Sequence, residues 1–254
     1  MNAPVDSSDA WMIYYARYKP AVGYPLVITT FTDTQCNKIQ SPFYAALLPK
    51  LGFNRKTPRD IILYGPLKYG GMNMMDIKTE QLARHVHNHI IQLRKDDRVG
   101  KTIMACIDMY QGTLGTRTPF YTRNAFDFDY RPPRSMSVIT YIWESLSRIG
   151  FTLHISNAWV PKQDHDNDTA IMDDMMEERK RRSGQTGTFQ KYDLWMANAC
   201  RLYLKISMLS DIIQPWVFSG DRQLDTTIKH PYQPRPPEKA WKACIYSMLT
   251  FLRL

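Results

Sequence analysis

The chain has 254 residues, 44% of them hydrophobic, which is enough to bury a substantial core in one large domain or two smaller ones. Its formal net charge of +9 at pH 7 favours an anionic partner, most often nucleic acid. No segment approaches the roughly 18 consecutive apolar residues of a transmembrane helix, so no membrane span is expected. The cysteines Cys36, Cys106, Cys200 and Cys244 are widely spaced, which indicates reduced thiols in an intracellular protein, cytoplasmic or nuclear.

The positive charge is unevenly distributed along the chain. Residues 31–101 contain 12 Lys and Arg against 6 Asp and Glu, and residues 191–254 contain 9 against 5, whereas residues 161–190 contain 5 against 7. A basic surplus at both ends of the folded region attracts phosphates without giving a sequence preference. The alternative is a basic soluble protein that has no nucleic-acid site.

The amino-terminal part combines an unpatterned start with strand and helix signals. Residues 1–23 are expected to form a loose lead-in, truncated from a longer parent. The β-branched run at 25–32 predicts a strand. Asp33 or Thr34 then predicts the start of one short helix, and Pro42 the start of another.

Two amphipathic helices are expected after a turn-rich segment at 52–71. Asp76 is expected to cap the first, whose apolar residues recur with a period near 3.6. These residues are Leu82, Val86, Ile90 and Leu93. The second helix extends from Val99 to Leu114 and is expected to end near Gly115.

The next elements are a helix, a strand and a charged helix. Ser137 predicts the start of a helix that buries Trp143 and stops at Gly150. The segment 151–156 alternates apolar and polar residues and therefore predicts a strand. The charged helix is expected at about 170–182.

The domain organisation follows from a linker signal. Residues 183–188 are small and polar, so they cannot bury apolar area. The expected parts are the lead-in (1–23), a helical unit with one or two strands (24–182), the linker, and a carboxy-terminal helix pair (189–254). The fold class is mainly α with a few short strands, a helical bundle in two parts.

Acidic pairs raise the question of a metal site. Asp173 and Asp174 are adjacent, as in a polymerase hairpin, but the charged helical sequence that follows them favours a helix start. Asp127 and Asp129 form a D-x-D pair, which is interpreted as part of a surface loop. A metal-dependent nuclease would need three neighbouring carboxylates from Asp127, Asp129, Asp166, Asp168, Asp173 and Asp174.

Histidines offer a weaker metal signal. His85 and His89 share a helix face at the i,i+4 spacing that two zinc ligands use. The glutamate of an H-E-x-x-H motif is missing, so polar-face histidines or a phosphate contact are expected. No metal and no other cofactor is assigned to this chain.

Several motifs follow one another in a characteristic order. Residues 51–81 read LGFNRKTPRDIILYGPLKYGGMNMMDIKTEQ; later motifs are RTPFY at 117–121, HDNDTAIMD at 165–173, ANACRLYLKISMLSDI at 197–212 and YQPRPPEKAWKACIYSML at 232–249. In this order they resemble the region downstream of the catalytic palm in reverse-transcriptase polyproteins of eukaryotic retroelements. The resemblance covers roughly residues 30–250.

The resemblance implies a thumb- or connection-like helical unit that grips the backbone of an RNA or DNA duplex. In that family the polymerase carboxylates lie upstream. The chain is therefore expected to be a fragment of a retrotransposon RNA-directed DNA polymerase, without polymerase activity by itself. The alternative is a non-catalytic protein-interaction or structural remnant of a decayed retroelement.

Charge and position, rather than the resemblance, select the expected phosphate contacts. The basic loop, the helix after it and the long carboxy-terminal helix are expected to supply them. They are Arg55, Lys56, Arg59, Lys68, Arg84, Arg201 and Lys205. Convergence of the loop and the 201/205 face on one concave strip would favour nucleic-acid binding over the remnant interpretation.

Overall fold

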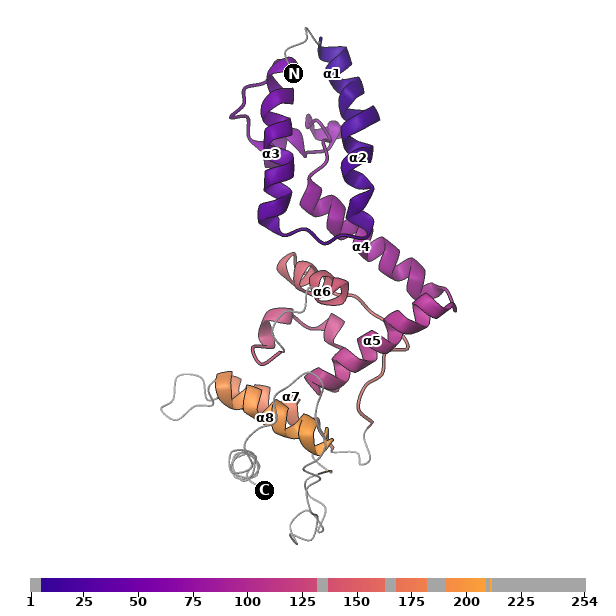
Figure 1. Ribbon diagram of the computed structural model, residues 1–254. Helices are drawn as coiled ribbons and strands as arrows, with labels where there is room; N and C mark the ends of the chain where they lie inside the picture. Colours follow the sequence, from indigo (N-terminus) through magenta and orange to yellow (C-terminus); the bar gives the residue numbers. More distant parts are fainter. Residues whose placement is uncertain (1–5, 132–136, 163–167, 182–190, 209–210, 212–254) are drawn as a thin grey trace. The chain divides into compact units, whose positions relative to one another are not determined.

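The computed structural model describes residues 6–131, 137–162, 168–181, 191–208 and 211 (Figure 1). These residues are mostly helical, which confirms the main fold class. Within them, β pairing is limited to one isolated bridge, between Ala170 and Met208. The chain divides into two compact units, residues 1–95 (unit 1) and 96–254 (unit 2), so the boundary differs from the expected one. The 183–188 linker and most of the carboxy-terminal helix pair lie outside the described residues.

Unit 1 begins with a continuous helical segment instead of a loose lead-in. The segment comprises α1 (Ser7–Ile13), a π-helical turn (Tyr14–Tyr18) and α2 (Lys19–Gly23). The Asp6 side chain caps α1. Tyr14 is fully buried, and its hydroxyl accepts a hydrogen bond from Met75 N–H at 2.6 Å. Burial of aromatic rings therefore orders a segment whose sequence shows no simple pattern.

A single helix, α3 (Asp33–Lys50), replaces the two short helices expected. Thr32 and Gln35 form a capping box at its start. The helix lies beside the α1–α2 segment (Figure 1). Its buried side chains follow the helical period and are Cys36, Gln40, Tyr44, Leu47 and Leu48.

The strand expected at 25–32 does not form. Pro25–Val27 is a 3₁₀ turn, and the Gln81 side chain binds both backbone groups of Phe31. Gln81 Nε2 donates to the Phe31 carbonyl at 3.1 Å, and Gln81 Oε1 accepts from Phe31 N–H at 2.9 Å. One amide side chain thus takes the groups that a β-ladder would use.

The next helix, α4 (Ile77–Arg94), starts where the sequence predicts, because the Asp76 carboxylate accepts from Thr79 N–H at 3.1 Å. Its most buried face is not the expected apolar one. The buried residues are Ile77, Gln81, His85 and His89, whereas the predicted Leu82, Val86, Ile90 and Leu93 are half-buried. The buried face of α4 therefore adds polar side chains to the apolar interior of unit 1.

Unit 2 contains α5 (Arg98–Leu114), α6 (Val138–Arg148), α7 (Ile171–Arg181) and α8 (Lys191–Leu204). Gly115 has φ 68° and ends α5 in a left-handed turn, as predicted. Ser137 caps α6 by accepting from Ile139 N–H. Trp143 of α6 is buried against the rings of Tyr110, Phe120 and Phe128, whose centroids are 6.0, 5.0 and 5.2 Å away.

The second predicted strand, 151–156, is not formed: residues 151–155 have no regular secondary structure, and residue 156 begins a turn. Leu153 N–H donates to the Tyr121 carbonyl at 3.1 Å. A sequence in which apolar and polar residues alternate forms a strand only where the edge of a neighbouring strand is available for hydrogen bonding. The surrounding elements of unit 2 are helices and turns, so the expectation of one or two strands is wrong for the described residues.

Candidate nucleic-acid interface

The Gly-Pro and Gly-Gly turns of the 51–81 motif fold into a closed loop in unit 1. Met72 N–H donates to the Ile62 carbonyl, and Met74 N–H donates to the Leu63 carbonyl, both at 2.8 Å. These bonds bring the two ends of the loop together. Because Leu63 and Met74 are also buried, the loop is anchored in the core of unit 1.

Two glycines allow this loop to close. Gly70 has φ 82°, which side-chain-bearing residues rarely adopt. A Cβ on Gly71 would lie 2.1 Å from the carbonyl oxygen of Gly65, so only glycine permits this approach of two backbone segments. The closed loop presents residues 67–69, Leu-Lys-Tyr, to solvent.

A second loop carries the basic cluster. Phe53 N–H donates to the Leu48 carbonyl at 2.9 Å and Gly52 has φ 81°, so α3 ends in a left-handed turn. Arg55 and Lys56 follow in an exposed turn. The end of α3 thus holds two cations at the surface of unit 1.

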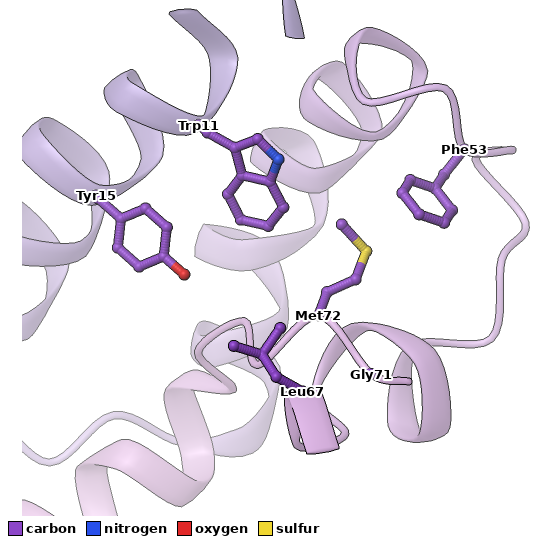
Figure 2. A pocket seen from close by; sticks show the side chains of 6 residues that line it. All are labelled: Trp11, Tyr15, Phe53, Leu67, Gly71 and Met72. Atoms are coloured by element: carbon purple, nitrogen blue, oxygen red, sulfur yellow. The ribbon is translucent and has the colours of Figure 1, made fainter. Parts of the chain in front are cut away.

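The two loops and the first helical segment line an open groove with a volume of about 470 Å³. The residues that line the groove are Trp11, Tyr15, Phe53, Leu67, Gly71 and Met72. Figure 2 shows the rings of Trp11 and Tyr15 on one helical segment facing Leu67 and Met72, with Phe53 beyond Met72. Trp11 and Tyr15 stack with ring centroids 5.6 Å apart and an interplanar angle of 21°.

Cations lie next to the rings around the groove. Lys68 Nζ is 4.6 Å from the centroid of the Tyr69 ring, and Lys19 Nζ is 5.7 Å from the centroid of the Tyr15 ring. Among the described residues, no carboxylate lies within 4.0 Å of the charged groups of Arg55, Lys56 or Lys68. These three predicted contacts are therefore free to bind an external anion.

Two other predicted contacts in unit 1 are engaged within the protein. Arg59 is half-buried and donates to the Ser41 hydroxyl at 3.1 Å. Arg84 Nε donates to Glu80 at 2.7 Å, and its guanidinium packs against Gly23 of α2. Arg84 is thus paired with a carboxylate of its own helix, and a phosphate would have to displace that partner.

Arg201 is not a surface residue, which corrects its assignment as a phosphate contact. It is 2% exposed and inserts into the carboxy-terminal end of α5. Its Nη2 donates to the carbonyls of Gly112 and Thr113 at 2.8 and 2.9 Å, and to Asn198 Oδ1 at 2.9 Å. A Cβ on Gly115 would lie 2.4 Å from Arg201 Cζ, so the glycine that ends α5 also makes room for the guanidinium.

Arg201 therefore acts as a tertiary helix cap. The last carbonyls of a helix lack intrahelical partners and carry partial negative charge, which a cation stabilises. Burial lowers the pKa of Arg201 to about 10, which leaves the group charged at neutral pH. α8 ends at Leu204, and Lys205 has φ 59°, so the predicted 201/205 helix face does not exist. Lys205 itself is exposed.

The aspartates considered for a metal site are bound to cations and hydroxyls in unit 2. Asp127 lies 3.6 Å from Lys180 Nζ, and Asp129 lies 3.0 Å from Arg179 Nη2. Asp173 pairs with the guanidinium of Arg123.

Asp174 accepts a hydrogen bond from the Thr169 hydroxyl, and burial raises its pKa. Asp173 and Asp174 lie in the first turn of α7, which confirms the predicted helix start. Asp166 is outside the described residues. In the described ranges, no three His, Cys, Asp or Glu side chains form a metal-binding group, so the nuclease interpretation gains no support.

The histidines also differ from expectation. His85 and His89 are buried in unit 1 instead of lying on a polar face, whereas His87, between them on α4, is exposed. Thr30 Oγ1 lies 3.5 Å from His85 Nε2. Burial lowers the pKa of His85, and lowers the pKa of His89 to about 4. Both are therefore neutral core residues at pH 7.

The sequence analysis missed the aromatic side of the groove. Trp11, Tyr15 and Lys19 recur at four-residue intervals, and Asp6 provides a capping residue before them. That signal was available in the sequence. Tyr69 was also overlooked, although it follows Lys68 directly.

None of the helices in the described residues combines the length and the apolar character needed to cross a bilayer. Comparison with protein-family models, curated proteins and solved structures gave no match to this chain.

Proposed function

We propose that this chain is the thumb- or connection-like, backbone-gripping part of a retrotransposon reverse transcriptase, and that unit 1 binds nucleic-acid phosphates. The observation that carries the proposal is a set of exposed cations on the two loops of the 51–81 motif, which no ion pair of the described residues neutralises, namely Arg55, Lys56 and Lys68. Two independent supports are the basic surplus across residues 31–101 and the ordered series of motifs that resembles this family.

The proposed phosphate contacts are fewer than the seven that the sequence predicts. Arg55, Lys56 and Lys68 are the principal phosphate ligands, because they are exposed and no carboxylate of the described residues neutralises them. Arg59 is a secondary contact, since its guanidinium already donates to Ser41. Each contact supplies affinity without sequence preference.

The wider proposal concerns the parent protein and its location. The parent enzyme would be an RNA-directed DNA polymerase whose catalytic carboxylates lie outside this chain, as the resemblance implies. An intracellular location, nuclear or cytoplasmic, is part of the proposal; reduced Cys36 and Cys106 are compatible with such a location.

Binding of the full chain to an RNA–DNA hybrid duplex at several salt concentrations tests the phosphate grip. We expect affinity to fall steeply as salt rises. The triple variant Arg55→Ala, Lys56→Ala, Lys68→Ala should weaken binding and reduce the log–log salt slope by roughly one for each lost phosphate contact.

The matched control removes the same charge from other exposed positions of unit 1, with Lys38→Ala, Arg94→Ala and Lys95→Ala. This control should keep most of the affinity. If both triple variants bind alike, the attraction is a property of net charge and the loops are not the site. Affinity that does not respond to salt would contradict the proposal altogether.

A further inference from the structure

The wall of the groove and the adjoining 67–69 loop expose aromatic rings that the core of unit 1 does not require: Tyr15 lines the groove, and Tyr69 lies on the loop two residues after the lining residue Leu67. Tyr15 is 47% exposed and Tyr69 is 77% exposed, whereas Tyr14 and Tyr44 in the same unit are fully buried. Trp11 is half-buried and stacks on Tyr15, so two rings form a short platform at one wall of the groove. Leu67, 68% exposed, stands on the facing loop.

Each exposed ring has its own cation. Lys19 lies beside Tyr15, and Lys68 lies beside Tyr69, with ammonium-to-centroid distances of 5.7 and 4.6 Å. Arg55 comes two residues after Phe53, which closes the groove at the other end. An apolar protein segment would match the rings but would leave these charges without partners.

Alternating rings and cations fit a chain that carries a flat base and a phosphate in every repeat. Bases stack on aromatic side chains, and the neighbouring phosphates bind Lys and Arg. A duplex keeps its bases stacked on one another and offers only its backbone to such a surface. Because the bases of a duplex are not available for stacking, the exposed rings would have no function in duplex binding.

We propose that the groove of unit 1 and the adjoining 67–69 loop bind single-stranded nucleic acid, with bases stacked on Tyr15 and Tyr69 and with phosphates held by Lys19, Lys68 and Arg55. This inference rests on the proposed phosphate grip and adds the form of nucleic acid that the groove selects. RNA and DNA share the chemistry, and comparison of their affinities distinguishes them.

The test uses the full chain and fluorescence anisotropy with labelled oligo-dT, oligo-U and a blunt duplex of matched length. The double variant Tyr15→Ala, Tyr69→Ala should bind both single strands roughly 5- to 100-fold more weakly and should bind the duplex unchanged. The variant Tyr15→Phe, Tyr69→Phe keeps both rings and should retain affinity. Tyr24→Ala removes a tyrosine that is 82% exposed but neither lines the groove nor belongs to the 67–69 loop, so it should have no effect.

The outcomes separate this inference from the function on which it rests. If the wild-type chain binds neither form, the phosphate grip itself is wrong. If it binds both forms equally and the aromatic variants change nothing, the phosphate grip stands and the stacking inference is wrong. Light scattering that shows a dimer dissociated by Tyr15→Ala, without binding to any strand, would assign the groove to a second copy of the chain and overturn the inference.

Discussion

The loop around Arg55 in unit 1 and the contact around Arg201 in unit 2 use the same side chain in different ways. Arg55 is exposed on a turn after a helix end, whereas Arg201 is buried against the end of α5, where it binds backbone carbonyls. The two positions are equally suitable as phosphate contacts in the sequence, since each is an arginine with a second cation close by, Lys56 in one case and Lys205 in the other. Only the residues around a cation decide whether it binds a partner or stabilises the fold.

Other polar groups of the two units also differ in whether they are exposed or bound within the protein. In unit 1, neutral polar side chains such as Gln81 and His89 are buried beside an apolar core, while Arg55, Lys56 and Lys68 are exposed. In unit 2, charged groups are paired inside the protein, as in the contacts of Asp173 with Arg123 and of Glu144 with Arg131 at 3.1 Å. Arg55, Lys56 and Lys68 of unit 1 are, by contrast, exposed cations that no ion pair of the described residues neutralises.

The largest expected effect is the loss of the buried guanidinium. Arg201→Met removes the donor of the Gly112 carbonyl and of Asn198 Oδ1 and leaves the Thr113 carbonyl with Asn198 Nδ2, which should lower the free energy of unfolding by about 3–5 kcal/mol. Urea denaturation followed by circular dichroism measures the loss. Hydrogen exchange should locate it in α5 and α8.

Arg201→Lys serves as the comparison for this variant. Lysine keeps the charge but lacks the planar set of donors, so it should recover only part of the stability. Equal stability of Arg201→Met and the wild type would mean that the tertiary cap contributes nothing.

Acid should destabilise unit 1 through its buried histidines. Folding lowers the pKa of His85 and His89 below the ordinary 6.5, so the unfolded chain binds protons first as the pH falls. The stability is complete above about pH 6.5 and is lost progressively toward pH 4, by on the order of 3 kcal/mol for His89. Arg201 keeps its charge throughout this range.

Hydrogen exchange at pH 7, 5.5 and 4.5, corrected for intrinsic rates, should show protection lost in α4 before α5. The variant His89→Gln should flatten the pH dependence of α4, and His87→Gln, at an exposed position, should not. Parallel loss of protection in both helices of the wild type would argue against a histidine origin.

The smallest expected effect on stability comes from the three loop cations. Arg55, Lys56 and Lys68 are exposed and make no ion pair with the described residues, so replacing all three by alanine should change the free energy of unfolding by less than about 0.5 kcal/mol each. Thermal and urea denaturation measure this change. A large loss would show that these cations serve the fold, as Arg201 does, and would weaken their assignment to a ligand.

Local chemistry in the sequence determined the helix ends. Asp76, Ser137 and Gly115 act where predicted, because a side-chain cap or a left-handed turn needs only residues within a few positions. The mainly helical class followed from the same local signals. The interpretation of Asp173 and Asp174 as a helix start also needed no tertiary information.

Contacts between distant residues decided the rest. Residues 25–32 have the composition of a strand, yet Gln81, 50 positions after Phe31, takes the backbone groups that a sheet would need. The four-residue spacing of Arg201 and Lys205 predicted a shared helix face, but α8 ends between them and α5 encloses the guanidinium. The groove exists because backbone closure at Gly65 and Gly71 places Leu67 opposite Trp11 and Tyr15. A side chain's environment depends on which segments pack around it, and sequence spacing describes only its own segment.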